Sequence, residues 1–336
     1  MLPDDIRKTL NVKITNTDHP RELVVDVMFA LQDHYGYLND EAVAEMIRDH
    51  QIDILVDLAG HTDKNRLLTF ARKPAPIQIT YLGYLGTTGL SAMDYILIDH
   101  YVEPAGIGDA YYSEQLLRLP DSLWCYRPSV NAPEILPLPA LARGYLTFGS
   151  FNNFNKVDQP TLDLWAELLR ALPTSRLMIL SVPEGEVRQH LLRRFGDLGI
   201  DAQRLELHGK LPILEFRRKV LEVDLALDPV TVNGGTTTCE SLWMGVPVMS
   251  LVGTRFPSRA GLSILSTAGL ADFAAASRED YLHLARHLAD NLPLLAEIRA
   301  GLRAHVAGSA LIDEVGFTRN IETLYREVWG EWCGAA

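Results

Sequence analysis

The feature that most constrains the fold of this chain is a repeated alternation of helical segments with short, almost unbroken apolar runs. The segment 39–51 opens with a cap-type asparagine and acidic residues, and its apolar residues then recur at helical spacing. It leads into the run IDILVDLAG at 52–60, and a second run, MDYILID, follows at 93–99. Such runs are typical of parallel strands that are buried on both faces. The alternation predicts a doubly wound α/β sheet.

A proline-rich segment at 127–144 interrupts this alternation. Repeated prolines resist both helix interiors and central strands, so we place a domain boundary there. A chain of 336 residues also exceeds what one hydrophobic core usually organises. We therefore predict a Rossmann-like half at 1–130, a second Rossmann-like half at 145–310, and a C-terminal helix at 311–336 that packs back on the first half. A binding site is expected in a cleft that the two halves face.

The alternation restarts after the proline-rich segment. The stretch TLDLWAELLRAL predicts a helix that buries Leu162, Trp165, Leu168 and Leu169 on one face. Strands are predicted at YLTFGSF, RLMILSV, RLELHG, VDLALD and VPVMSLV, and further helices at 186–196, 212–222 and 237–244.

Composition excludes several classes of protein. The net charge of −12 argues against a nucleic-acid partner, because phosphate backbones are bound through accumulated Lys and Arg. The longest apolar runs fall well short of the roughly 20 residues that span a bilayer, so no membrane partner is expected. The cysteines Cys125, Cys239 and Cys333 are odd in number and far apart, which indicates neither a disulfide framework nor a zinc site. We expect a cytoplasmic protein.

The stretch VDLALDPVTVNGGTTTCESLW contains the strongest candidate site. A strand ends near Asp228, an irregular loop follows, and a helix begins at the threonines. Free amides at a helix start bind anions, glycines admit close approach of a phosphate, and an acidic residue one turn later is placed for a ribose diol. The alternative is an ordinary capped helix start. The candidate residues for nucleotide binding are Asn233, Gly234, Gly235, Thr236, Thr237 and Glu240.

Several ordered motifs resemble the catalytic region of the O-GlcNAc transferase and SPINDLY family of protein glycosyltransferases. They are DILVDLAGHT, RKPAPIQITYLGYLGTTG, TFGSFNNFNKV, and DLALDP followed by NGGTTTCESLWMGVPV. The resemblance runs from about residue 40 to the C-terminus. It implies a GT-B-like fold, with two Rossmann-like doubly wound domains facing a cleft.

The resemblance also assigns residues in the second half. Lys156 matches the lysine that meets the donor diphosphate, and Asn153 matches a polar position beside it. Thr236 and Thr237 match the phosphate-contacting pair, and Glu240 stands where the family has an acidic ribose ligand. The lysine and the helix dipole would then stabilise the departing diphosphate, a task that other transferases give to a divalent cation. No metal and no cofactor are implied.

Base choice depends on Phe216, which occupies the position where many relatives place an aromatic residue or histidine against uracil. A phenylalanine ring can stack on a base but has no group that hydrogen-bonds to it.

The first half is expected to supply the sugar pocket. Leu82, Gly83 and Tyr84 match positions that line the donor sugar, although a plain turn is the alternative. His61 follows a buried strand and is a candidate proton shuttle, because an unperturbed imidazole titrates near neutral pH. A structural histidine is the alternative for that position.

Two expected features of the family are missing. The segment 1–29 shows no clear first strand and no histidine-containing motif, and no TPR repeats precede the catalytic region. The leading hypothesis is an inverting transferase that moves GlcNAc from UDP-GlcNAc to Ser or Thr of a protein. The alternatives are an O-fucosyltransferase that uses GDP-fucose, an inactive nucleotide-sugar-binding protein, and a sugar-nucleotide epimerase, for which we find no acid and base array.

Overall fold

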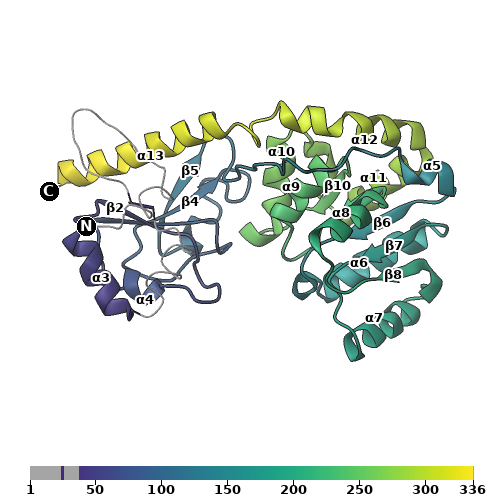
Figure 1. Cartoon of the computed structure of the whole chain (residues 1–336), viewed down its shortest axis with the longest axis horizontal. Coiled ribbons are helices and arrows are strands. Elements are labelled where there is room, and N and C mark those ends of the chain that lie inside the picture. The colour runs from purple at the N-terminus through teal and green to yellow at the C-terminus, as the bar shows by residue number, and fades with distance from the viewer. Residues whose placement is uncertain (1–23, 26–37, 336) are drawn as a thin grey trace. The chain divides into compact units, whose positions relative to one another are not determined.

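The computed structural model describes residues 24–25 and 38–335, and the chain divides into two compact units (Figure 1). The first unit takes in the chain up to Leu123 together with the chain from Val315 onward, and the second comprises Trp124–Glu314. The proline-rich segment thus belongs to the second unit. Of the segment 1–29, the structure describes only Val24–Val25, and the rest of our expectation for it lies outside the described residues.

The first unit is built on a parallel sheet whose described strands follow the sequence order β1-β2-β3-β4-β5. The predicted runs are buried on both faces of the sheet, because the adjacent residues Ile54 and Leu55 of one run, and Ile96 and Leu97 of the other, are all buried. The strands are β1 (Val24–Val25), β2 (Ile54–Asp57), β3 (Ile77–Tyr81), β4 (Tyr95–Asp99) and β5 (Gln115–Leu119). The strands predicted at 52–60 and 93–99 are confirmed.

Three α-helices described in the first unit pack around this sheet, namely α3 (Asp40–Asp49), α4 (Leu67–Phe70) and α13 (Glu314–Ala335). Asn39 caps α3 by accepting from the amide of Ala42, which confirms the predicted helix start. On α13, Phe317 lies 6.4 Å from the ring of Tyr81 between centroids, and Asn320 donates to Asp121 at 3.2 Å.

The second unit has the strand order β11-β10-β9-β6-β7-β8, and every pairing is parallel. This order runs outward in both directions from the pair β6 and β9, which is the doubly wound Rossmann order. The strands are β6 (Thr147–Ser150), β7 (Arg176–Ile179), β8 (Leu205–Leu207), β9 (Leu225–Leu227), β10 (Val248–Leu251) and β11 (Ala274–Ala275). The carboxyl ends of β6 and β9 therefore form a topological switch point.

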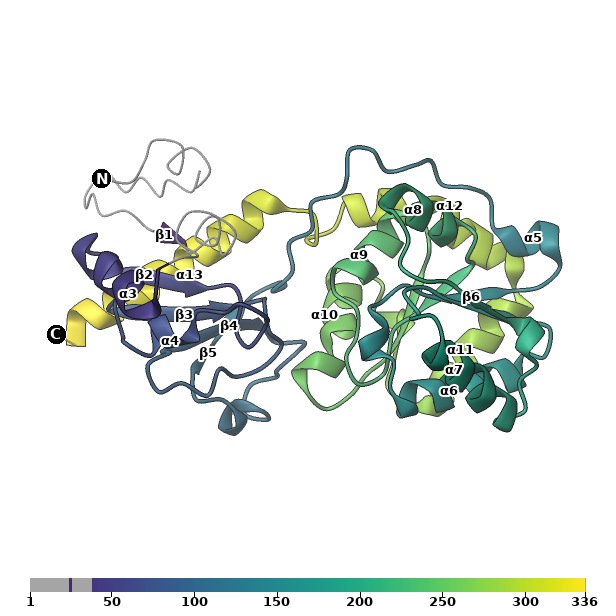
Figure 2. The same cartoon turned by 60° about the horizontal axis from the view of Figure 1, so that its bottom comes forward.

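Helices cover both faces of this sheet, with α6, α7 and α11 below it in Figure 2 and α8 and α12 above it. Trp165, Leu168 and Leu169 of α6 are buried, as its spacing predicts. The bounds are α5 (Pro139–Arg143), α6 (Gln159–Ala171), α7 (Glu186–Asp197), α8 (Ile213–Leu221), α9 (Thr236–Trp243), α10 (Ala260–Thr267), α11 (Arg278–Asp290) and α12 (Leu292–Ala307).

Two arginines of α12 hold the proline-rich segment on the second unit. Arg299 donates to the carbonyl oxygens of Leu136, Leu221 and Val223 at 2.7–2.9 Å, and Arg303 donates to the carbonyl of Pro133 at 2.7 Å. Prolines remove strand and helix hydrogen bonds, but they leave carbonyl acceptors that these guanidinium groups satisfy.

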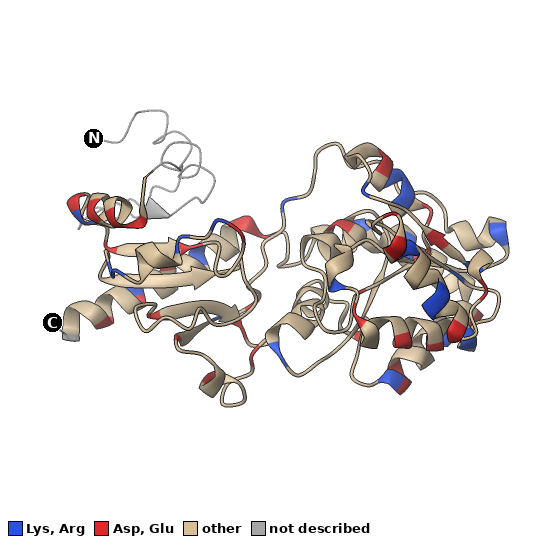
Figure 3. Ribbon diagram, turned by 90° about the horizontal axis from the view of Figure 1, so that it is seen from below, with Lys and Arg blue, Asp and Glu red and all other residues tan. Residues whose placement is uncertain are grey.

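Acidic and basic side chains are interspersed over the described chain (Figure 3). Among the described helices, none has the length and apolar character that crossing a membrane requires.

Candidate functional site

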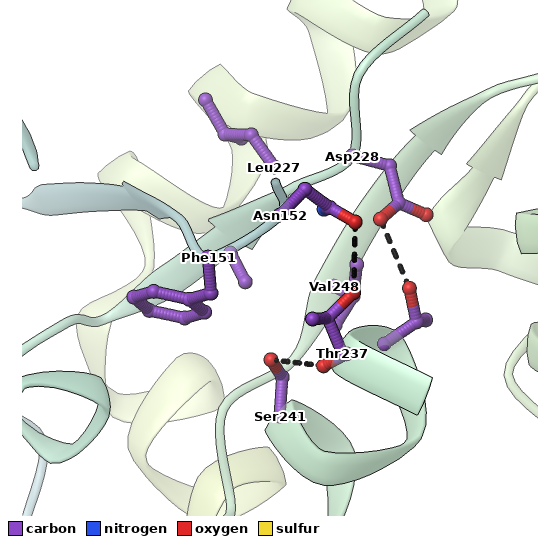
Figure 4. Close-up of a pocket in the computed structure, with 9 residues that line it drawn as sticks. Phe151, Asn152, Leu227, Asp228, Thr237, Ser241 and Val248 are labelled. Atoms are coloured by element: carbon purple, nitrogen blue, oxygen red, sulfur yellow. Dashed lines mark hydrogen bonds between the residues drawn. The ribbon is translucent and has the colours of Figure 1, made fainter. Parts of the chain in front are cut away.

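A pocket lies at the switch point of the second unit, where parallel α/β sheets place their ligands (Figure 4). Its empty volume is about 170 Å³. Residues that follow β6, residues of β9 and its carboxyl end, and one face of α9 line it, together with Val248 of β10. They are Phe151, Asn152, Ala226, Leu227, Asp228, Thr237, Thr238 and Ser241.

Asp228 organises the floor of this pocket. Its side chain is buried and accepts from the amide of Gly234 at 3.2 Å, from Thr238 Oγ1 at 3.0 Å and from Ser250 Oγ. Burial raises the pKa of this carboxyl, and those hydrogen bonds oppose the rise. The carboxylate thereby fixes the glycine loop to two neighbouring elements, α9 and β10.

Helix α9 begins without a side-chain cap, because its N-cap residue is Gly235. A Cβ at Gly235 would lie 2.8 Å from the ring of Trp124, and one at Gly234 would lie 2.2 Å from Thr238 Oγ1. Only glycine fits at either position without displacing these neighbours. An uncapped helix start leaves its first amides to another acceptor, as the anion-site hypothesis requires and an ordinary capped start does not.

The two threonines at this helix start differ in environment. Thr236 is exposed, whereas Thr237 is half-buried and donates from Oγ1 to Asn152 Oδ1 at 2.8 Å. Ser241 donates to the carbonyl oxygen of Thr237 one turn later at 2.8 Å (Figure 4).

Lys156 reaches the same loop from the segment that follows β6. Its Nζ donates to the carbonyl oxygen of Asn233 at 2.8 Å. Burial lowers the pKa of this amine, and the charge of Asp228 opposes the shift. Asn233 is fully buried and accepts through Oδ1 from the amide of Gly261, so one residue joins the lysine, the glycine loop and the start of α10.

Asn153 does not share this position. Its side chain is exposed and accepts from the amide of Asn155 at 3.1 Å, which caps the short helical turn Phe154–Lys156. Its neighbour Asn152 is the buried residue that contacts the start of α9, through Thr237. Asn152 is therefore added to the candidate site, and the role of Asn153 beside the diphosphate stays a prediction.

Phe216 and Glu240 lie on α8 and α9. The ring of Phe216 meets that of Phe151 edge to face, with centroids 6.1 Å apart, and Phe151 itself lines the pocket. Glu240 accepts from Arg217 Nε at 2.9 Å and from the hydroxyl of Tyr126 at 2.6 Å.

The predicted residues of the first unit gather at the carboxyl ends of β2 and β3. Gly83 packs so closely on Leu58 that a Cβ would lie 2.0 Å from its carbonyl oxygen, and the preceding Leu82 has φ of 63°. His61 Nε2 lies 2.9 Å from the carbonyl oxygen of Thr88, and its ring meets that of Tyr84 edge to face at 5.1 Å between centroids. Both the imidazole and Tyr84 are exposed.

Residues 29–126 and 137–321 match the family model described as Glycosyl transferase family 41. The chain belongs to this family. The resemblance to O-GlcNAc transferases and SPINDLY proteins is thereby confirmed.

This chain is similar to curated SPINDLY proteins. It is 40% identical over 308 residues to a probable UDP-N-acetylglucosamine–peptide N-acetylglucosaminyltransferase SPINDLY of Solanum lycopersicum, and the match covers 90% of this chain and 32% of that protein. The chain thus spans about a third of the length of the curated relatives it matches.

Solved structures agree on the fold. An O-GlcNAc transferase mutant of Thermobaculum terrenum matches with a TM-score of 0.84 and 36% identity, over 89% of this chain and 57% of that one. Sucrose-phosphate synthase of Thermosynechococcus elongatus matches with a TM-score of 0.57 at 12% identity, over 90% of this chain and 79% of that one. The predicted α/β, GT-B-like class is confirmed.

Sequence reasoning missed four residues of the candidate site: Asn152, Asp228, Tyr126 and Arg217. Asp228 had a readable signal, because a charged residue at the end of an apolar strand is placed at the ligand-binding edge of a parallel sheet. Tyr126 and Arg217 gave none, since they meet Glu240 from 114 and 23 residues away in the sequence. Within the described residues, no group of three or more His, Cys, Asp or Glu is arranged to hold a metal.

Proposed function

We propose that this chain is the catalytic region of an inverting glycosyltransferase that moves GlcNAc from UDP-GlcNAc to a Ser or Thr hydroxyl of a protein. The observation that carries the proposal is the meeting of Lys156, the uncapped start of α9 and the switch point of a Rossmann sheet in one place. The relatives described as peptide N-acetylglucosaminyltransferases support the choice of sugar and acceptor.

In this proposal the diphosphate takes the start of α9. Amides of 235–237 and the hydroxyl of Thr236 donate to the phosphate oxygens. The hydroxyl of Thr237 turns to them from Asn152, and Lys156 turns from the Asn233 carbonyl to the stronger, charged acceptor. As the glycosidic bond of the donor breaks, negative charge grows on the departing UDP. Donors fixed in advance stabilise that charge at the moment of reaction.

The same two features lead us to propose metal-independent transfer, because a lysine and a helix dipole supply positive charge where UDP leaves. His61 is the proposed proton acceptor for the protein hydroxyl. The tautomer protonated at Nε2 donates to the Thr88 carbonyl and leaves Nδ1 as the basic nitrogen. A cytoplasmic location belongs to the proposal as well, and the three free cysteines agree with a reducing compartment.

GDP-fucose is a second candidate donor, and the side chain of Phe216 favours keeping it. A phenylalanine stacks on guanine and uracil alike and hydrogen-bonds to neither. Phe216 therefore does not distinguish a uracil donor from a guanine donor, and a binding titration is needed to identify the base.

Calorimetric titration of the full chain with UDP, GDP, UDP-GlcNAc and GDP-fucose tests the proposal. We expect binding of UDP and UDP-GlcNAc with the same affinity in EDTA and in Mg²⁺, and transfer of GlcNAc to an acceptor peptide. Binding of GDP and GDP-fucose without binding of UDP and UDP-GlcNAc would show that the donor is GDP-fucose. Binding that EDTA abolishes and Mg²⁺ restores would contradict metal independence.

A further inference from the structure

Two side chains from outside α9 hold the carboxylate of Glu240. Arg217 of α8 donates to Oε1 at 2.9 Å, and the hydroxyl of Tyr126 donates to Oε2 at 2.6 Å. The side chains of Arg217 and Glu240 are 12% and 16% exposed, so solvent reaches this cluster only in part. Each carboxylate oxygen thus has one fixed donor and keeps a second acceptor position.

Tyr126 is itself fixed by its surroundings in the second unit. Its backbone amide donates to the carbonyl oxygen of Leu311 at 2.8 Å, and the next residue, Arg127, donates from Nε to Glu314 at 2.7 Å. Trp124 packs its ring on Gly235 at the start of α9. The residues that open the second unit are therefore anchored both to α9 and to the segment that closes the unit.

We propose that Tyr126 is a positioning residue for ribose recognition. With Arg217, it fixes both oxygens of Glu240 so that their remaining acceptor positions meet the 2′ and 3′ hydroxyls of the bound nucleotide. This inference rests on the proposed function and on the ribose role that the sequence predicts for Glu240. A free glutamate side chain would lose rotamer entropy when it bound a diol, and a side chain held in advance has already lost it.

The contacts also explain why an acidic residue suits this position although both oxygens are occupied. A carboxylate accepts at about four positions, and Arg217 and Tyr126 use two of them. Burial and the hydrogen bond to Glu240 raise the pKa of Tyr126, so its hydroxyl stays a donor. Tyr126 therefore orients Glu240 without removing its capacity to accept from a ligand.

The test compares UDP with 2′,3′-dideoxyuridine diphosphate by calorimetry, on the full chain and on Tyr126→Phe. Wild type should bind UDP about tenfold or more tighter than the dideoxy compound, as hydrogen bonds to a charged group give. In Tyr126→Phe this preference should shrink to about threefold or less, while dideoxy binding stays unchanged. Tyr145→Phe is the matched control, since Tyr145 precedes the amino end of β6, opposite the pocket, and should keep the full preference.

Several outcomes separate this inference from the function on which it rests. A full ribose preference in Tyr126→Phe, or an equal loss of both ligands, would overturn the positioning role. A wild-type chain that binds UDP and its dideoxy analogue equally would overturn it too. A wild-type chain that binds neither UDP nor GDP would instead overturn the proposed function. If Tyr126→Phe melts at a lower temperature than wild type, Arg217→Gln must show the same selective loss.

Discussion

Lys156 is a half-buried amine whose hydrogen bond goes to a neutral group, the carbonyl oxygen of Asn233, at 2.8 Å. Burial disfavours its charged form, which the lowered pKa reflects. A diphosphate at the start of α9 would relieve this cost, because an anion favours the ammonium. The residue is therefore expected to contribute to affinity for the leaving group and little to stability of the free protein.

Lys156→Ala should weaken UDP binding by about 1.5 to 3 kcal/mol, the range for hydrogen bonds to charged groups. Calorimetry measures this, with Lys73→Ala as the control, because Lys73 is an exposed lysine of the first unit that pairs with Asp94. UDP affinity that is unchanged in Lys156→Ala would remove the lysine from the site.

The same lysine predicts a pH dependence. The folded, free protein holds the pKa of Lys156 below its usual value, and bound diphosphate should raise it again. Binding then takes up a proton above the pKa of the free form, so UDP affinity is full at lower pH and falls as the pH rises through the lowered pKa of Lys156 in the free protein. An arginine does not titrate in this range, so Lys156→Arg should flatten the profile. Equal profiles for the two proteins would contradict the assignment.

At the scale of elements, the start of α9 is the part of the fold that performs the proposed binding. Asp228, at the carboxyl end of β9, fixes the loop through the Gly234 amide, and Asn152 after β6 accepts from Thr237. The helix lacks a side-chain cap, so its first amides are offered to a ligand. The residues that follow β9 and β6, the two strands at the switch point, thus fix the conformation at the start of α9.

Replacing Thr236 and Thr237 with valine keeps the β-branched shape and removes two hydroxyl donors. The loss of each hydroxyl should weaken the binding of UDP by about 0.5 to 1.5 kcal/mol, and by more where its partner is a charged phosphate oxygen. The melting temperature of the free protein should fall modestly, because the buried Oδ1 of Asn152 loses its donor while Asp228 and Trp124 still hold the loop. A clear loss of stability with wild-type UDP affinity would indicate a structural helix start.

The sequence predicts the strands and the loop at Asn233 well, because apolar runs, glycines and helix spacing are local signals. It does not predict that β9 pairs with β6, since 74 residues separate Ser150 from Leu225 and no local pattern records their pairing. It also does not single out Asn152, whose side chain contacts α9 through Thr237. Adjacent side chains after a strand point in different directions, and only the backbone path shows which one faces α9.

At the scale of the whole molecule, the chain passes from the first unit to the second after Leu123 and returns after Glu314. The second unit fastens the proline-rich segment through Arg299, which is fully buried and donates to three carbonyl groups. Burial lowers the pKa of Arg299 to about 10, so the guanidinium keeps its charge at neutral pH.

Arg299→Leu should lower the free energy of unfolding of the second unit by about 3 kcal/mol, because it leaves three buried carbonyl groups without their donor and removes a positive charge near Asp224. Denaturant unfolding, monitored by hydrogen exchange, measures the stability of the second unit separately from that of the first. Arg278→Ala, which breaks an exposed pair with Glu167, should change stability by under about 1 kcal/mol. Equal effects of the two substitutions would contradict the structural role of Arg299.

The central claim is that the start of α9 holds the diphosphate of a sugar nucleotide. Hydrogen exchange of the backbone amides, measured on the full chain with and without saturating UDP, tests it most directly. We predict that UDP slows exchange at 235–237, where the first turn of α9 presents its amides. Exchange at 235–237 that stays unchanged while UDP binds, with protection elsewhere in the chain, would contradict the claim.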